Sequence, residues 1–208
     1  MKSLNKYLMQ SLNLVNQNMS KRLKLSQSEN IIERLRINKD ISPIKYNYYP
    51  KDYNELRSLL EQLLEERGKD ADLNDIDTSQ ITTFYDVENR KGLFQKLNPH
   101  NIDISRWDVS NVKNMSCMFY NCNNFDCDLS NWDVSNVNDM YCMFYDCKNF
   151  TGQGLENWDV SNVKNMQQMF WYSKKFDCNL SNWKVDKVEN MWHMFSGCDS
   201  LKKYPNWY

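Results

Sequence analysis

The apolar positions in the second half of the chain recur at a nearly fixed spacing. The hexapeptide Trp-Asp-Val-Ser-Asn-Val begins at Trp107, Trp132 and Trp158, and a degraded copy begins at Trp183, with spacings of 25, 26 and 25 residues. Each copy is followed by the motif Asn/Asp-Met-x-x-Met-Phe. A period in the twenties with fixed apolar positions is typical of solenoids. The pattern therefore predicts a stack of about five repeats of ~25 residues.

Within one repeat the apolar pattern changes its period. Residues 125–129 alternate apolar and polar side chains, which predicts a short strand. Met140, Met143 and Phe144 follow at i, i+3 and i+4, which predicts one helical turn facing the core. Between these two segments, the residues expected to point inward are Trp132, Val134 and Val137. A strand and a helical turn per repeat make an α/β repeat, a leucine-rich-repeat-like coil.

A strand and a helix are expected to cover the amino-terminal end of the stack, over residues 44–72. Residues 44–49 alternate like a strand and stop at Pro50. Asp52 and Glu55 resemble a capping box, and Gly68 supplies a helix stop. The leucines between them fall at helical spacing, at Leu56, Leu59, Leu60, Leu63 and Leu64. Because a solenoid end exposes an apolar cross-section, we assign these elements as its cap.

The solenoid itself is expected to span residues 73–208 and to have atypical ends. Residues 76–81 align with the hexapeptide with Ile76 in the Trp place, and the spacing of 31 residues to Trp107 predicts an insertion around residues 88–92. Trp207 lies 24 residues after Trp183. It therefore fills the last Trp position, within a carboxyl-terminal cap at about residues 199–208.

Residues 1–43 have no repeat and are expected to form a basic arm that is helical or partly disordered. Apolar residues at near-helical spacing predict an amphipathic helix over residues 3–25. Residues 1–45 carry nine Lys/Arg and three Asp/Glu, whereas the rest of the chain has a net charge of −7. Two interpretations stay open: an interaction tail on an acidic body, or a solvated lead-in.

The many Met, Trp and Cys residues follow the repeat. Eight of the eleven Met residues belong to the Met-x-x-Met pairs, where they fill irregular gaps in a core. Cys122, Cys147 and Cys198 share one repeat position with Ser173. A second position holds Cys117, Cys142, Gln168 and His193. We expect reduced thiols because the count of seven is odd, although neighbouring repeats would bring Cys122 and Cys147 near disulfide distance. A redox or metal role is the alternative.

The sequence predicts no enzyme, cofactor or metal site. Neither of the two histidines, His100 and His193, falls in a motif with a nucleophile or a metal partner. Asp108, Asp133 and Asp159 each follow the repeat Trp and are expected to form turns, with calcium binding by stacked carboxylates as the alternative.

Binding is expected where the repeats differ. Thirteen residues after the Trp stand Tyr120, Tyr145 and Trp171, and nine residues after it stand Tyr141 and Trp192. Tyrosine and tryptophan are enriched in binding hot spots, although partial burial between repeats explains them equally well. On the predicted strand side, Asp126, Asp128 and Asp177 form an acidic strip. These eight residues are the candidate partner-binding positions.

The repeat Asp-Leu-Ser-Asn-Trp-Asp-Val-Ser-Asn-Val-x-Asn-Met-x-x-Met-Phe resembles the BspA-like leucine-rich-repeat proteins of the mycoplasma lipoprotein repeat type, over residues 45–208. The resemblance implies a right-handed leucine-rich-repeat-like solenoid without catalytic residues. Many such proteins are bacterial surface proteins implicated in adhesion, and related repeats occur in phages and large DNA viruses. This chain differs by having no expected secretion signal, lipid anchor or membrane span.

We therefore predict a non-enzymatic protein–protein interaction module in the cytoplasm or on a virion. The alternative is a structural or adhesion protein of a virion or cell surface, tethered by its arm. The expected partner is a protein, and the basic arm is the one place where nucleic acid could bind.

Overall fold

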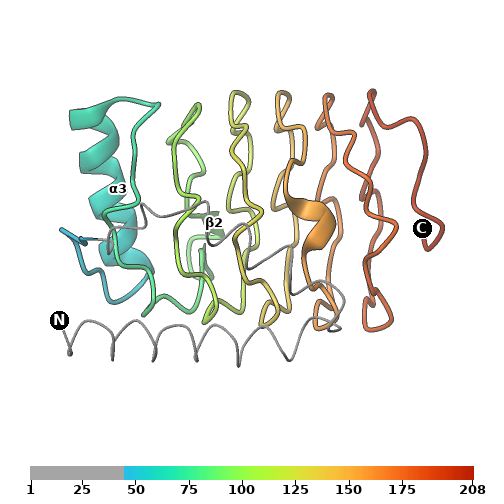
Figure 1. Cartoon of the computed structure of the whole chain (residues 1–208), viewed down its shortest axis with the longest axis horizontal. Coiled ribbons are helices and arrows are strands. Elements are labelled where there is room, and N and C mark those ends of the chain that lie inside the picture. The colour runs from blue at the N-terminus through green and yellow to red at the C-terminus, as the bar shows by residue number, and fades with distance from the viewer. Residues whose placement is uncertain (1–44) are drawn as a thin grey trace, which may run out of the picture. The chain divides into compact units, whose positions relative to one another are not determined.

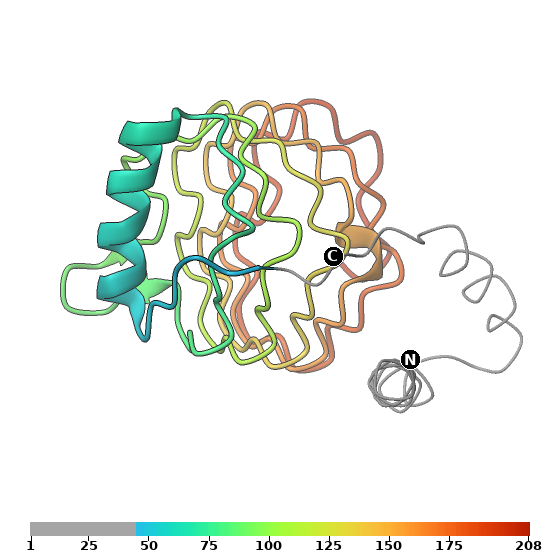
Figure 2. The same cartoon turned by 60° about the vertical axis from the view of Figure 1, so that its left-hand side comes forward.

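A computed structural model describes residues 45–208 of the chain. Within this unit, successive turns of the backbone lie side by side, as Figures 1 and 2 show from two directions. We call each turn, which takes up one repeat, a coil. The predicted arm over residues 1–43 lies outside the described residues, as does the first residue of the predicted strand 44–49.

The predicted amino-terminal helix is confirmed as α3 (Tyr53–Arg67). Asp52 caps it, because its carboxylate accepts hydrogen bonds from the backbone amides of Asn54 and Glu55 at 2.9 and 3.0 Å. Such a cap satisfies amides that have no partner inside the helix. Gly68 ends the helix with a φ of 88°, a left-handed conformation that favours glycine.

One face of α3 packs on the first coil, at one end of the stack (Figures 1 and 2). The Tyr53 hydroxyl donates to the carbonyl of Lys91 at 3.2 Å. The guanidinium of Arg57 donates to the carbonyl of Gln95 at 2.9 Å and also to that of Leu93. Four leucines of the helix are buried against the coil: Leu56, Leu60, Leu63 and Leu64. The helix thereby shields the apolar core from water at this end.

The predicted insertion in the first repeat is a hairpin of β1 (Tyr85–Asp86) and β2 (Lys91–Gly92). The two strands pair antiparallel, with Tyr85 opposite Gly92. Gly92 is required sterically, since a Cβ atom there would lie 1.7 Å from the carbonyl oxygen of Cys117. The hairpin is therefore fitted closely against the second coil.

The strands predicted at residues 44–49 and 125–129 are wrong. The first reduces to a single parallel bridge between Tyr48 and Ile76. Residues 125–129 alternate between buried and exposed side chains as predicted, but they form no strand. Amides near this segment bond to side chains instead: those of Thr151 and Ser130 donate to the carboxylates of Asp126 and Asp128.

The helical turn predicted at residues 140–144 is also wrong, because consecutive tight turns occupy this segment. Cys142 has a left-handed φ of 51°, which no helix contains. The amide of Met143 donates within its own coil, to the carbonyl of Met140 at 3.2 Å. The amide of Cys142 donates to the next coil, to the carbonyl of Gln167 at 3.0 Å. This alternation satisfies the backbone inside a coil and also joins one coil to the next.

Parallel bridges hold equivalent positions of successive coils in register. They join Thr83 to Asn114, Asn114 to Asp139, Asp139 to Asn165 and Asn165 to Asn190. The right-handed leucine-rich-repeat-like class stays a prediction.

Tryptophan and phenylalanine columns fill the core. The Nε1 atom of Trp132 donates to the carbonyl of Ile104 at 3.1 Å, and the other repeat tryptophans bond in the same way to an earlier coil. Trp207 extends the column, as predicted: its Nε1 atom donates to the carbonyl of Leu180 at 2.9 Å and its ring stacks on Trp183. The phenylalanine column consists of Phe94, Phe119, Phe144, Phe170 and Phe195.

Polar residues of the hexapeptide close the turns on the outside. The carboxylates of Asp108, Asp133 and Asp159 each accept from the amide two residues later, which confirms their role as turn formers. The asparagine of each full copy also reaches back one coil. The Nδ2 atom of Asn136, for example, donates to the carbonyl of Ser110 at 2.7 Å.

Candidate partner-binding surface

Three of the predicted binding residues lie in one row on consecutive coils. The rings of Tyr120 and Tyr145 stack with their centroids 4.4 Å apart and an angle of 14° between their planes. The ring of Trp171 meets Tyr145 edge-on at 5.2 Å. All three side chains are partly exposed, as the sequence predicted. The repeat thus places one aromatic ring per coil on the same outer face.

The row continues through residues that the sequence analysis did not select. Trp171 stacks on Tyr172 and on His193, each with a centroid distance of 5.4 Å. The ring of the predicted residue Trp192 packs on that of His193, with a centroid distance of 3.9 Å. Tyr172 is 46% exposed and Trp192 is 59% exposed, the highest values in this group. We call the whole group the aromatic ridge, consisting of Tyr120, Tyr145, Trp171, Tyr172, Trp192 and His193.

Tyr172 occupies a repeat position whose backbone has a left-handed φ in four coils. Asn121, Asp146, Tyr172 and Gly197 occupy equivalent positions, and all have left-handed φ angles between 53° and 77°. Asn, Asp and Gly tolerate this conformation, whereas a bulky Tyr adopts it only where the surroundings hold it there. The residue types at this position were the signal in the sequence that would have marked Tyr172.

At one end of the ridge, the Tyr120 side chain is uncharged around neutral pH. Burial raises the pKa of Tyr120 to about 12, so its hydroxyl stays protonated. Tyr141, which was predicted beside the ridge, is partly exposed, and its hydroxyl bonds to the sulfur of Cys142, which raises the pKa of Tyr141. The ridge therefore offers ring surface and the neutral hydroxyl of Tyr120 to a partner.

The three residues of the predicted acidic strip, Asp126, Asp128 and Asp177, have different neighbours. Asp126 accepts from the Thr151 hydroxyl at 2.9 Å and borders a polar depression that also contains His100. Asp128 closes its own turn by accepting from the amide of Ser130 at 2.9 Å. Asp177 borders a different depression. Thr151 joins Asp126 and Asp177, since its amide donates to the Asp126 carboxylate at 3.1 Å and its carbonyl accepts from the amide of Asp177 at 3.3 Å. A binding role for these carboxylates stays a prediction.

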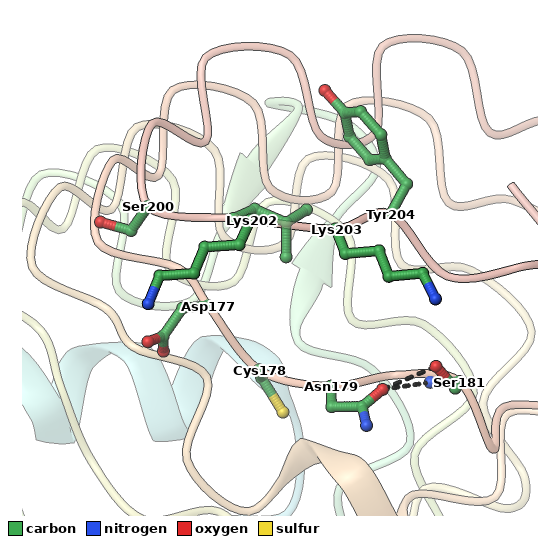
Figure 3. A pocket seen from close by; sticks show the side chains of 9 residues that line it. Asp177, Cys178, Asn179, Ser181, Ser200, Lys202, Lys203 and Tyr204 are labelled. Carbon is green, nitrogen blue, oxygen red and sulfur yellow. Dashed lines mark hydrogen bonds between the residues drawn. The ribbon is translucent and has the colours of Figure 1, made fainter.

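The depression beside Asp177 has mixed charge (Figure 3). Lys202 and Lys203 extend over it from the last coil, and the ammonium group of Lys202 lies on the side of Asp177. Asn179 accepts from the hydroxyl and the amide of Ser181 at 2.7 and 3.1 Å. Tyr204 stands at its edge, where it is 54% exposed. None of the residues that line this depression belongs to the aromatic ridge.

Over residues 45–208, no three His, Cys, Asp or Glu side chains gather in a way that would hold a metal ion. In the same range, no helix has the length and apolar composition needed to cross a membrane.

Comparison with protein families gives two overlapping matches to one family, described as Mycoplasma protein of unknown function, DUF285. They cover residues 58–153 and 88–207. The chain belongs to this family. DUF285 is related to the BspA-like repeat proteins. Comparisons with curated proteins and with solved structures gave no significant match. The second DUF285 match contains the whole aromatic ridge.

Proposed function

We propose that this DUF285 protein is a non-enzymatic protein–protein interaction module of the BspA-like type. In this proposal residues 73–208 form a right-handed leucine-rich-repeat-like solenoid, and the aromatic ridge recognises a protein partner. The observation that carries the proposal is the row of aromatic rings on consecutive coils. The predicted alternative, a structural or adhesion protein tethered by residues 1–43, depends on a segment outside the described residues.

The solenoid assignment is supported by the register of the coils. Parallel bridges at Asn114, Asp139, Asn165 and Asn190 repeat the same contact from coil to coil. In the core, the Trp and Phe columns likewise make equivalent contacts from one coil to the next. In repeat proteins each unit contacts mainly its neighbours, so one scaffold can present different side chains at equivalent outer positions.

The ridge has the composition of a protein-binding hot spot. Tyr and Trp supply large contact areas with few rotatable bonds, and interface centres are depleted in charged residues. The residue before each of the first three ridge rings belongs to the core column, where Phe119, Phe144 and Phe170 stack on one another. This packing orders the backbone that carries the ridge. A preordered surface loses less conformational entropy on binding.

The geometry around the two histidines supports a role without catalysis. His193 packs between Trp171 and Trp192, and its Nδ1 atom lies 2.9 Å from the Ser196 hydroxyl. His100 lies 3.8 Å from a carboxylate oxygen of Asp70 on an exposed surface. Neither histidine stands in an enclosed pocket where a substrate would be held and water excluded.

Affinity capture from the native host tests the proposal. The full chain, a ridge variant (Tyr145→Ser with Trp171→Ser) and a control variant (Lys202→Ser with Lys203→Ser) serve as baits. Circular dichroism melts first establish that all three fold. We expect the wild type and the control to retain the same protein and the ridge variant to lose it. Equal retention by all three folded baits would contradict a role for the ridge.

A further inference from the structure

Backbone hydrogen bonds between neighbouring coils follow one pattern, which repeats along the stack. The amide of Met140 donates to the carbonyl of Asn165 on the next coil at 2.9 Å. The amide of Lys164 donates back to the carbonyl of Asn138 at 2.8 Å. Each coil therefore presents both a donor and an acceptor to the coil that follows it, as paired parallel strands do.

At the amino-terminal end of the stack, side chains of α3 take over this pairing. The outward-facing carbonyls of the first coil are those of Lys91, Leu93 and Gln95. The Tyr53 hydroxyl donates to the first of them, and the Arg57 guanidinium donates to the other two. The cap thus supplies the donors that a preceding coil would have supplied, which satisfies the backbone at this end.

At the opposite end of the stack from α3 (Figure 1), the last coil presents a row of backbone groups without such partners. Within residues 45–208, the carbonyl of Glu189 and the amides of Met191 and His193 have no hydrogen-bond partner, although their equivalents in the preceding coils bond to the next coil. The row ends at Phe195, where the ring of Tyr208 packs edge-on at 5.0 Å and its hydroxyl bonds to the backbone. We call residues 189–193 the open edge.

Side chains at the open edge are more exposed than their equivalents inside the stack. Met115, Met140 and Met166 are fully buried, whereas the equivalent Met191 is partly exposed. Trp192 beside it is 59% exposed. An edge with unpaired backbone groups and apolar side chains is a template on which another chain can pair.

We propose that the open edge binds an extended segment of a partner protein, which lies parallel to residues 189–193 and adds one further rung to the stack. The segment accepts from the amides of Met191 and His193 and donates to the carbonyl of Glu189. An apolar side chain of the segment covers Met191. In this mode of recognition main-chain bonds give affinity, and side-chain contacts give specificity. The inference goes beyond the proposed role of the aromatic ridge, because it depends on backbone groups.

A second copy of this chain fits the open edge less well than an extended segment does. The carbonyls at its amino-terminal end already bond to Tyr53 and Arg57. Two copies with their last coils facing each other would bring together identical rows, in which the amides of Met191 and His193 outnumber the carbonyl of Glu189. An extended segment with free carbonyl and amide groups supplies what the row needs.

The probe for this site is a synthetic peptide with the sequence of residues 161–168, Ser-Asn-Val-Lys-Asn-Met-Gln-Gln. In the fold this segment makes the same three bonds with the coil before it. Its carbonyls accept from the amides of Met140 and Cys142, and its Lys164 amide donates to the carbonyl of Asn138. Its one methionine stands at the position that would cover the edge.

Hydrogen exchange of the isotope-labelled full chain, followed by NMR, measures binding at single amides. Without the peptide, the amides of Met191 and His193 should exchange faster than those of Met166 and Gln168, which bond to the last coil at 2.8 and 2.9 Å. Saturating peptide should slow exchange at Met191 and His193 and shift their signals.

Three results would overturn the proposal. The peptide may be added to saturation elsewhere or fail to bind, so that exchange at Met191 and His193 stays fast. Both amides are already slow in the free chain and become fast when residues 1–44 are deleted, which would make that segment the occupant. Their protection grows with protein concentration without peptide, which would make a second copy the occupant.

A matched pair of variants isolates one backbone donor. Met191→Pro removes the amide hydrogen, whereas Met191→Ala keeps it and loses the same side chain. Asn190, which precedes the proline, forms a parallel bridge and is therefore in the extended region that proline favours in its neighbour. Circular dichroism melts establish that both variants fold.

We expect the Met191→Pro variant to bind the peptide about fivefold more weakly than Met191→Ala, which corresponds to the loss of one hydrogen bond. Equal affinity of the two folded variants would overturn the proposal. If the proline variant does not fold, exchange at His193 in Met191→Ala decides, since the peptide should still slow it. Because the test uses neither a captured partner nor a change at Tyr145 or Trp171, its failure is distinct from a failure of the ridge.

Discussion

Tyr120 stacks on Tyr145 with a centroid distance of 4.4 Å, and the neighbouring pair in sequence, Phe119 and Phe144, stacks at 5.4 Å inside the core. Adjacent residues thus build one column inside the protein and one outside. The outer spacing is set by the same coil-to-coil hydrogen bonds that set the inner one. Sequence variation in the outer column can therefore change a binding surface while the core column is kept.

The Trp column should dominate stability. Trp132 is 4% exposed and stacks on Trp158 at 6.4 Å. Replacing it with Ala removes this packing and leaves the Ile104 carbonyl without its Nε1 donor, so we expect a loss of about 3–5 kcal/mol in urea unfolding. The control is Trp192→Ala on the exposed ridge, which should stay within about 0.5 kcal/mol of the wild type. A loss under about 1 kcal/mol for Trp132→Ala would mean that the column is not core.

The asparagine that bonds to the preceding coil should contribute modestly to the free energy of unfolding. Asn136→Ala removes the hydrogen bond to the Ser110 carbonyl on an exposed surface, so we expect a loss of about 0.5–1.5 kcal/mol. In the last coil the equivalent residue is Lys187, which donates to Asn162 of the preceding coil at 2.7 Å. We therefore expect Asn136→Lys to lose less stability than Asn136→Ala. Urea melts that rank Ala as the more stable of the two would contradict this account.

The ion pair between Arg67 and Asp75 should make part of the stability depend on pH. The hydrogen bonds from Arg67, at 2.9 and 3.0 Å, lower the pKa of Asp75 below the ordinary value of 3.8. The unfolded chain then binds this proton more readily, so the stabilisation is present above 3.8 and is lost as the pH falls through the lowered value.

Arg67→Gln tests this dependence. We expect the variant to be less stable than the wild type at neutral pH by about 1 kcal/mol or less from the ion pair, because both side chains are partly solvated. The difference should shrink as the pH falls well below 3.8. Urea melts across this range measure it, and a difference that is the same at every pH would contradict the assignment.

Helix α3 and the Trp column could be predicted because their signals are local and periodic. Asp52, Gly68 and the leucine spacing define the helix, and Trp207 fits the column by its spacing alone. The helical turn at residues 140–144 could not be predicted correctly. A pattern of i, i+3 and i+4 apolar residues also arises from consecutive tight turns, and Cys142 carries no sequence mark of a left-handed φ.

The candidate surface was predicted in part for the same reason. Tyr120, Tyr145 and Trp171 share one repeat position, so stacked coils bring them together. Asp126 and Asp177 also share a repeat position, and Thr151 on the coil between them bonds to both. The strand predicted at residues 125–129 is not formed, because an apolar and polar alternation also arises where irregular backbone runs along the core.

The affinity of the captured partner for matched variants tests the central claim, that the aromatic ridge is the binding surface. Calorimetry compares the wild type with Trp171→Ala and with the control Lys202→Ser/Lys203→Ser. A hot-spot ring contributes about 2 kcal/mol or more, so we expect Trp171→Ala to raise the Kd by about 30-fold. The control should change it less than about threefold. An unchanged Kd for the folded Trp171→Ala variant, with weakened binding of the control, would contradict the claim.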